Sequence, residues 1–114
     1  MEFSLIEKHN SIHVKVYGPE PWRPQTFYPL IDRLGEQIKD AYIRNKRTVV
    51  FDFLGLNFID SYMISMLVQT SRLTEPERNI ILATDNQVLA IITLIGIDRI
   101  FSVYHSEKEW LQKQ

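Results

Sequence analysis

The chain has 114 residues, of which 45% are hydrophobic and 24% are charged, and its formal net charge is −1. This balance is that of an ordinary globular domain, without the strongly basic surface that binds nucleic acid or anionic membranes. The absence of cysteine excludes disulfides and thiolate catalysis, and no apolar run approaches the roughly 20 residues that span a bilayer. No secretory signal is recognisable. We therefore expect one cytoplasmic domain over residues 1–114, without membrane insertion.

The first half of the chain predicts a hairpin followed by a helix. Residues 2–7 and 11–17 have strand patterns, and a turn at 9–10 would join them into an antiparallel pair. Residues 18–24 hold one glycine and three prolines, which predicts a stiff loop. The helix that follows carries an apolar stripe at helical spacing, formed by Phe27, Leu30, Ile31, Leu34, Ile38 and Tyr42.

The second half alternates strands and helices. Residues 48–53 and 79–84 are nearly continuous apolar runs, typical of strands that are covered on both faces. Between them, residues 61–74 predict a helix that closes before Pro76. This alternation predicts an α/β domain with a largely parallel sheet.

The end of the chain carries several helix boundary signals. Asp85 or Asn86 can cap the next helix, and Gly96 is placed to end it. Its expected buried stripe consists of Val88, Ile91, Ile92 and Ile95. Residues 99–104 predict a short strand or extended piece, and Ser106 with Glu109 has the spacing of a capping box that starts a last helix.

Asp60 and Ser61 stand side by side between two apolar runs and open the helix predicted at 61–74. Both residue types are good N-caps, because their side chains accept from amides that the first turn leaves free. The same position would also expose the Ser61 hydroxyl at a helix N-terminus, which tolerates a phosphate. From the residues alone, a structural cap and a phosphate acceptor are both open.

The helix at 61–74 carries two apolar stripes, although a helix on one face of a sheet needs only one. The stripe expected to face the core consists of Ile64, Leu67, Val68 and Ser71. The second stripe consists of Tyr62, Met66, Gln69 and Leu73, with Met63 beside them. It either packs under a neighbouring helix or forms an exposed contact patch, for which methionine is well suited.

Other chemical signals are missing. His9, His13 and His105 lack the spacing of metal ligands, and we expect them at the surface or at strand edges. The four glycines are scattered, so no phosphate-binding loop is predicted, and no serine has the surroundings of a hydrolase nucleophile. The sequence therefore predicts no metal, no cofactor and no enzyme.

Two segments of the second half resemble a known family. Residues 48–67, TVVFDFLGLNFIDSYMISML, and 79–111, NIILATDNQVLAIITLIGIDRIFSVYHSEKEWL, are similar to the STAS domain of anti-sigma factor antagonists. In that family a strand leads into an Asp-Ser-x-Gly motif that opens a helix, and Asp60-Ser61 match its first two positions. Residues 95–101, IGIDRIF, match a later signature. The resemblance covers about 46–111 well and the preceding residues only by the order of elements.

The resemblance implies a fold and a mechanism. The fold is a mixed sheet of four or five strands with helices packed mainly on one side. The mechanism is bacterial partner switching: the unphosphorylated antagonist binds an anti-sigma factor that is itself a serine kinase, the kinase phosphorylates the motif serine, and a phosphatase resets the cycle. On this resemblance Ser61 is the phosphorylated residue, and Asp60 is its supporting neighbour.

The resemblance also implies where the partner binds. Tyr62, Met63 and Met66 would lie near the partner surface together with Asp60 and Ser61, which favours a contact patch as the role of the second stripe. Trp22, in the proline-rich loop, either packs with that loop against the domain or is a further candidate interface anchor. An apolar helix face could equally support a homodimer.

One departure from the family pattern keeps a second hypothesis open, and a third follows from the α/β shape alone. Met63 stands where the motif has glycine, and a glycine would let a kinase approach the backbone closely. The second hypothesis is therefore an adaptor that is not phosphorylated, serving as a subunit of a transporter or a stress-sensing assembly. The third, an enzyme or small-ligand protein of similar α/β shape, ranks last because a catalytic constellation is missing.

Overall fold

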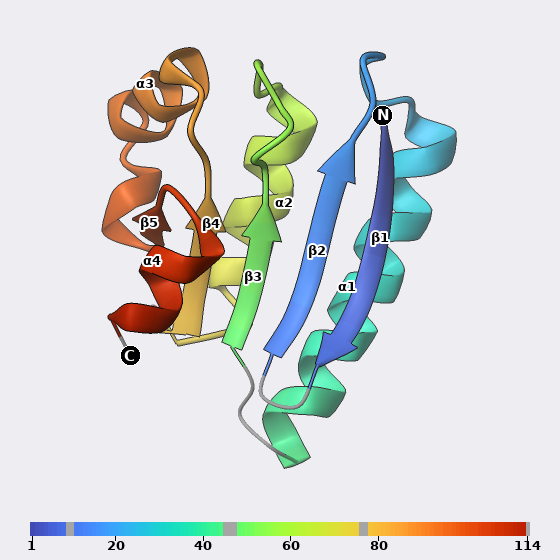
Figure 1. The fold of residues 1–114 in the computed structure, drawn as a ribbon. Coiled ribbons are helices and arrows are strands. Elements are labelled where there is room, and N and C mark those ends of the chain that lie inside the picture. The colour runs from blue at the N-terminus through green and yellow to red at the C-terminus, as the bar shows by residue number, and fades with distance from the viewer. Residues whose placement is uncertain (9–10, 45–47, 76–77, 114) are drawn as a thin grey trace.

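A five-stranded sheet forms the centre of the computed structural model, which describes residues 1–8, 11–44, 48–75 and 78–113. The strands are β1 (Glu2–Lys8), β2 (Ser11–Tyr17), β3 (Thr48–Asp52), β4 (Asn79–Leu82) and β5 (Ser102–Tyr104). They lie side by side in chain order (Figure 1). β1 pairs antiparallel with β2, and the other neighbours pair in parallel. The predicted mixed sheet is confirmed, while the turn predicted at 9–10 lies outside the described residues.

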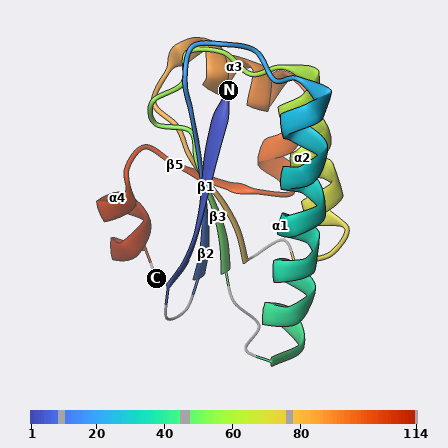
Figure 2. The same ribbon diagram turned by 90° about the vertical axis from the view of Figure 1, so that its right-hand side faces the viewer.

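Four α-helices within the described residues cover the sheet unevenly. They are α1 (Pro24–Arg44), α2 (Ser61–Ser71), α3 (Asn86–Leu94) and α4 (Glu107–Gln112), with a 3-10 turn at Ile97–Arg99. Figure 2 shows α1 and α2 on one side of the sheet and α4 on the other. α3 shares the core of α1 and α2, so the expectation of helices mainly on one side is confirmed. None of the described helices has the length and apolar character needed to cross a bilayer.

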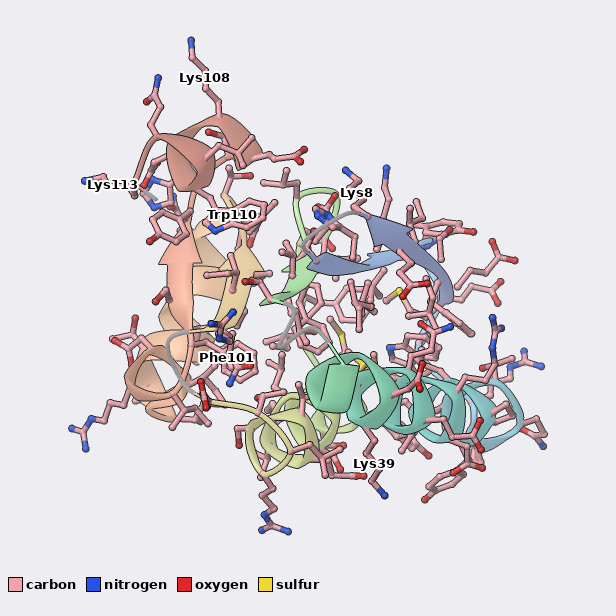
Figure 3. The ribbon with its side chains drawn as sticks, turned by 90° about the horizontal axis from the view of Figure 1, so that it is seen from below. Lys8, Lys39, Phe101, Lys108, Trp110 and Lys113 are labelled. Carbon is pink, nitrogen blue, oxygen red and sulfur yellow. The ribbon has the colours of Figure 1, made fainter. Side chains whose placement is uncertain are left out.

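The two faces of the sheet carry cores of different size. The larger core lies under α1, α2 and α3 and includes Phe51 and Phe101. The smaller core, under α4, consists of Val50, Ile80, Leu82 and Trp110. Figure 3 shows Trp110 directed toward the sheet from α4 and Phe101 on the opposite side. Continuous apolar strands are therefore explained by cover on both faces.

The helix boundary signals act as predicted. The Asp85 carboxylate accepts from the backbone N–H groups of Gln87 and Val88 at 2.9 and 3.1 Å, so Asp85 caps α3. Gly96 follows α3 with a φ of 80°, a left-handed conformation that favours glycine. At α4, the Ser106 hydroxyl accepts from the N–H of Glu109 at 3.0 Å.

The buried stripe expected on α3 is only half correct. Val88 and Ile92 are buried, but Ile91 is half-buried and Ile95 is 44% exposed. Val88 and Ile92 face the core with Leu89 packed beside them, and this orientation of α3 leaves Ile91 and Ile95 partly in contact with solvent.

Candidate functional site

Asp60 and Ser61 lie where the loop after β3 enters α2. Asp60 is the N-cap, and its carboxylate accepts from the backbone N–H of Met63 at 2.9 Å. Ser61 is the first residue of α2, and its side chain is exposed. The predicted cap is confirmed for Asp60. The Ser61 hydroxyl is thus accessible at the positive end of a helix dipole, where a negative group is stabilised by about 0.3–1 kcal/mol.

Tyr62 is half-buried beside Ser61. Its ring lies 4.8 Å from that of Phe27 in α1, measured between centroids. This contact joins the start of α2 to α1 and holds the backbone next to Ser61 against the core. Tyr62 therefore keeps part of its surface available for contact while serving as a packing residue.

Met63 and Met66 are not on the surface, and the expectation of an exposed methionine patch is wrong. Both are 0% exposed, and the buried residues of α2 are Met63, Met66, Leu67 and Thr70. α2 lies beside α1 on the same face of the sheet, so the core-facing stripe is rotated toward the methionines. Ile64, Val68 and Ser71, which the sequence predicts on the core face, are only partly buried. The packed interpretation of the second stripe is therefore correct for the two methionines, whereas Gln69 and Leu73 of the same stripe are exposed.

Trp22 is also buried, so the packed-loop alternative is correct and the role of an exposed anchor is not. It is 4% exposed, and its ring lies 5.7 Å from that of Phe27 and 6.3 Å from that of Phe3. The proline-rich loop therefore turns its tryptophan inward and closes the end of the core between β1 and α1.

An apolar hollow adjoins Ser61. It measures about 350 Å³ and is lined by Phe58, Ile59, Gln87, Ala90 and Ile91, from the loop before α2 and the outer side of α3. Two peptide units separate Ile59 from Ser61, so their Cα atoms are at most about 7.6 Å apart. Sequence reasoning missed this surface because it predicts Ile91 in the buried stripe of the helix and assigns no role to Gln87 or Ala90. The i, i+3, i+4 spacing from Gln87 could have indicated it.

A second hollow of about 500 Å³ lies where the parallel strands end. Its lining comes from the loops after β2, β3 and β4 and includes Gly18, residues 54–58, Thr84 and Asp85. Crevices at the carboxyl ends of parallel strands are common ligand positions. Here the charged lining residue is Asp85, and its carboxylate already caps α3. The hollow therefore has the shape of a ligand site, but its lining residues do not form a catalytic group.

His13 is buried on the inner strand β2, in contrast to the surface or strand-edge position expected for it. It is 7% exposed, and its ring lies 5.9 Å from that of Trp110 in edge contact. Burial and the ammonium of Lys8 lower the pKa of His13, while Glu107 and Asp52 act in the opposite direction. A neutral imidazole under α4 is a packing group. Within the described residues, no group of three or more His, Cys, Asp or Glu side chains is arranged to hold a metal ion.

Comparison with known proteins identifies the fold. The sequence matches no protein-family model and no curated protein. The structure is similar to that of an anti-sigma factor antagonist from Mycobacterium paratuberculosis, with a TM-score of 0.76 and 19% identity over 98% of this chain and 92% of that one. The anti-sigma factor antagonist SpoIIAA in its unphosphorylated form gives a TM-score of 0.68 and 17% identity, with coverage of 98% and 95%.

A third structure, the Bacillus cell fate determinant SpoIIAA in its phosphorylated form, is similar with a TM-score of 0.62 and 14% identity over 98% of both chains. The likeness extends over nearly the whole chain in each case, including β1, β2 and α1, which the sequence resemblance matched only by order. This protein therefore has the STAS fold of the anti-sigma factor antagonists.

Proposed function

We propose that residues 1–114 form a STAS domain that acts in the bacterial cytoplasm as an anti-sigma factor antagonist. The domain binds an anti-sigma factor with serine kinase activity, or a similar partner, and phosphorylation of Ser61 ends that binding. A phosphatase restores the unphosphorylated form. The protein acts by binding rather than by catalysis.

One observation carries the proposal: an exposed serine at a helix N-terminus stands beside an apolar hollow. Ser61 is exposed at the first position of α2, and Phe58, Ile59, Ala90 and Ile91 line the hollow next to it. Apolar contact area beside a single exposed hydroxyl suits a partner surface that one modification can switch off. The fold shared with SpoIIAA, solved in a phosphorylated and an unphosphorylated form, supports the same assignment.

The physical effect of a phosphate differs between the free domain and a complex. In the free domain, the N-terminus of α2 favours the added charge, although the neighbouring Asp60 carboxylate opposes it. In a complex, the phosphate would carry about −1.5 to −2 charges and would lose its hydration water against the apolar surface of the partner. This desolvation is costly. Phosphorylation can therefore end binding without a change in the backbone.

Met63, which replaces the motif glycine, bears on the alternative of an adaptor that is not phosphorylated. Its side chain lies wholly in the core, whereas Ser61 is exposed. The methionine thus leaves the serine accessible, and this supports the switch over the adaptor. The adaptor, a subunit of a transporter or stress-sensing assembly, predicts that Ser61 variants bind their partner as the wild type does.

Affinity capture from the lysate of the native host, combined with mass spectrometry, tests the proposal. Wild type and Ser61→Ala should capture the same kinase, and Ser61→Asp should lose it. Phosphate should be found on Ser61 in protein isolated from that host. Equal capture by all three proteins, with Ser61 never phosphorylated, would reject the switch in favour of the adaptor.

A substitution in the hollow tests the contribution of this apolar surface to partner binding separately from that of Ser61. Ala90→Glu places a charge on an exposed position of the hollow and should abolish capture while the domain stays folded. Lys108→Glu is the control, because Lys108 lies on the outer side of α4, on the opposite face of the sheet (Figure 3). Undiminished capture by Ala90→Glu would place the partner elsewhere.

A further inference from the structure

β1 is an outer strand of the sheet with a long open edge. It has seven residues and no proline, and β2 is its partner on one side. Figure 2 looks onto this edge: β1 lies in front along its length, and α1 stands to one side. Across the described residues, no segment pairs with the outer edge. An edge of this kind presents unpaired N–H and C=O groups to any second strand.

The apolar side chains of β1 are only partly covered. Ile6 is 48% exposed on the face of the sheet that carries α4, and Phe3 and Leu5 are half-buried on the face that carries α1. The opposite outer strand, β5, has only three residues. β1 is therefore the edge at which pairing with another strand would bury the most apolar surface and form the most backbone hydrogen bonds.

We propose that β1 pairs antiparallel with β1 of a second copy of this chain, about a twofold axis at Leu5. The two sheets would become continuous. Such an interface is isologous, so each contact between two different positions occurs twice. This dimer involves neither Ser61 nor the hollow beside α3, and it stands or falls independently of the proposed function.

The order of charges along β1 selects the register. With Leu5 opposite Leu5 of the second copy, all seven residues are paired, and Glu2 faces Lys8 at both ends of the strand. In antiparallel pairing about a twofold axis, one residue lies on the axis, opposite the same residue of the second copy. The alternative registers therefore differ in which residue is at the centre. Centring on Ser4 places Glu2 opposite Ile6, and centring on Ile6 places Lys8 opposite Ser4. Only the Leu5 register pairs opposite charges directly, which stabilises cross-strand neighbours.

The face toward α1 supports the same register. Phe3 would lie opposite Glu7 of the second copy, because their positions are symmetric about Leu5. The guanidinium carbon of Arg33, in α1, already lies 5.6 Å from the centre of the Phe3 ring. The Glu7 carboxylate of the second copy would therefore approach Arg33, adding an opposite-charge contact on each side of the axis.

Lys8 has an existing contact that does not prevent this role. Its ammonium lies 3.5 Å from the Glu107 carboxylate of α4, and both side chains are 48% exposed. An exposed ion pair of this kind contributes little. The ammonium has three donors, so Lys8 can contact Glu107 and the carboxylate of the second copy together.

Charge reversal tests the register. Analytical ultracentrifugation should show a reversible dimer for wild type that weakens with added salt. Glu2→Lys alone and Lys8→Glu alone should each weaken self-association about tenfold or more, because each places like charges opposite one another at both ends of the strand. An equimolar mixture of the two variants should dimerise again, because each end of a mixed dimer would pair a lysine of one variant with a glutamate of the other.

Two controls keep the result interpretable. Lys108→Glu makes the same charge change as Lys8→Glu at a site directed away from the sheet, and it should dimerise as wild type does (Figure 3). Circular dichroism checks that each variant is folded. A wild type that stays monomeric at millimolar concentration would overturn the proposal. So would a dimer that neither single variant weakens, or a mixture of the two variants that fails to restore association.

Discussion

Truncation of Met66 is expected to destabilise the whole domain. Met66 is 0% exposed and lies beside a gap of about 30 Å³ that Leu34 and Ile38 of α1 also line. Removal of a buried Met side chain to Ala costs about 2–5 kcal/mol of unfolding free energy. Because the gap gives its neighbours room to shift into the new void, we expect the lower half of this range for Met66→Ala, about 2–3.5 kcal/mol.

Urea denaturation followed by tryptophan fluorescence measures this loss. In thermal unfolding, it corresponds to a melting temperature lower by roughly 8–14 °C for a domain of this size. Leu94→Ala is the matched control, because Leu94 is 80% exposed on α3, and its loss should change stability by less than about 0.5 kcal/mol. If Met66→Ala proved as mild as Leu94→Ala, the packing of α2 against α1 described here would be wrong.

Two further predictions concern stability. Gly35→Ala in α1 should raise the unfolding free energy by about 0.5–1 kcal/mol, because an added Cβ meets nothing within 4 Å and alanine favours the helix; a lower urea midpoint would contradict this. The lowered pKa of buried His13 means that the unfolded chain takes up this proton first as pH falls. Stability should therefore be full above about pH 6.5 and decline below it, by at most about 1.4 kcal/mol per pH unit, and His13→Gln should flatten that decline in urea titrations from pH 7.5 to 5. Equal slopes in both proteins would assign the decline to other groups.

The sequence predicts most of the architecture because its signals are local. Alternating and continuous apolar runs place the strands, and capping side chains such as Asp85 and Ser106 place helix starts. Gly96 ends α3 because its own backbone adopts a left-handed conformation, which needs no distant contact. Such features depend on residues a few positions apart, and they survive in the folded domain.

Which stripe of α2 is buried could not be predicted, because the answer depends on α1. Helical spacing offers a stripe with Ile64 and one with Met66, and only the neighbouring helix determines which of them faces the core. Trp22 and His13 follow the same rule. Each contacts an element distant in sequence, Trp22 the ring of Phe3 in β1 and His13 the ring of Trp110 in α4. The hollow beside Ser61 also joins two separate segments, the loop before α2 and α3.

The most direct test of the account is the affinity of the captured kinase for this protein with and without phosphate on Ser61. Isothermal titration would compare the unmodified protein with protein phosphorylated at that residue, both confirmed by mass spectrometry and circular dichroism. We predict that the phosphate weakens binding at least tenfold, a change of about 1.4 kcal/mol or more, while the domain stays folded. Equal affinity of the two forms would contradict the central claim that Ser61 switches the partner surface.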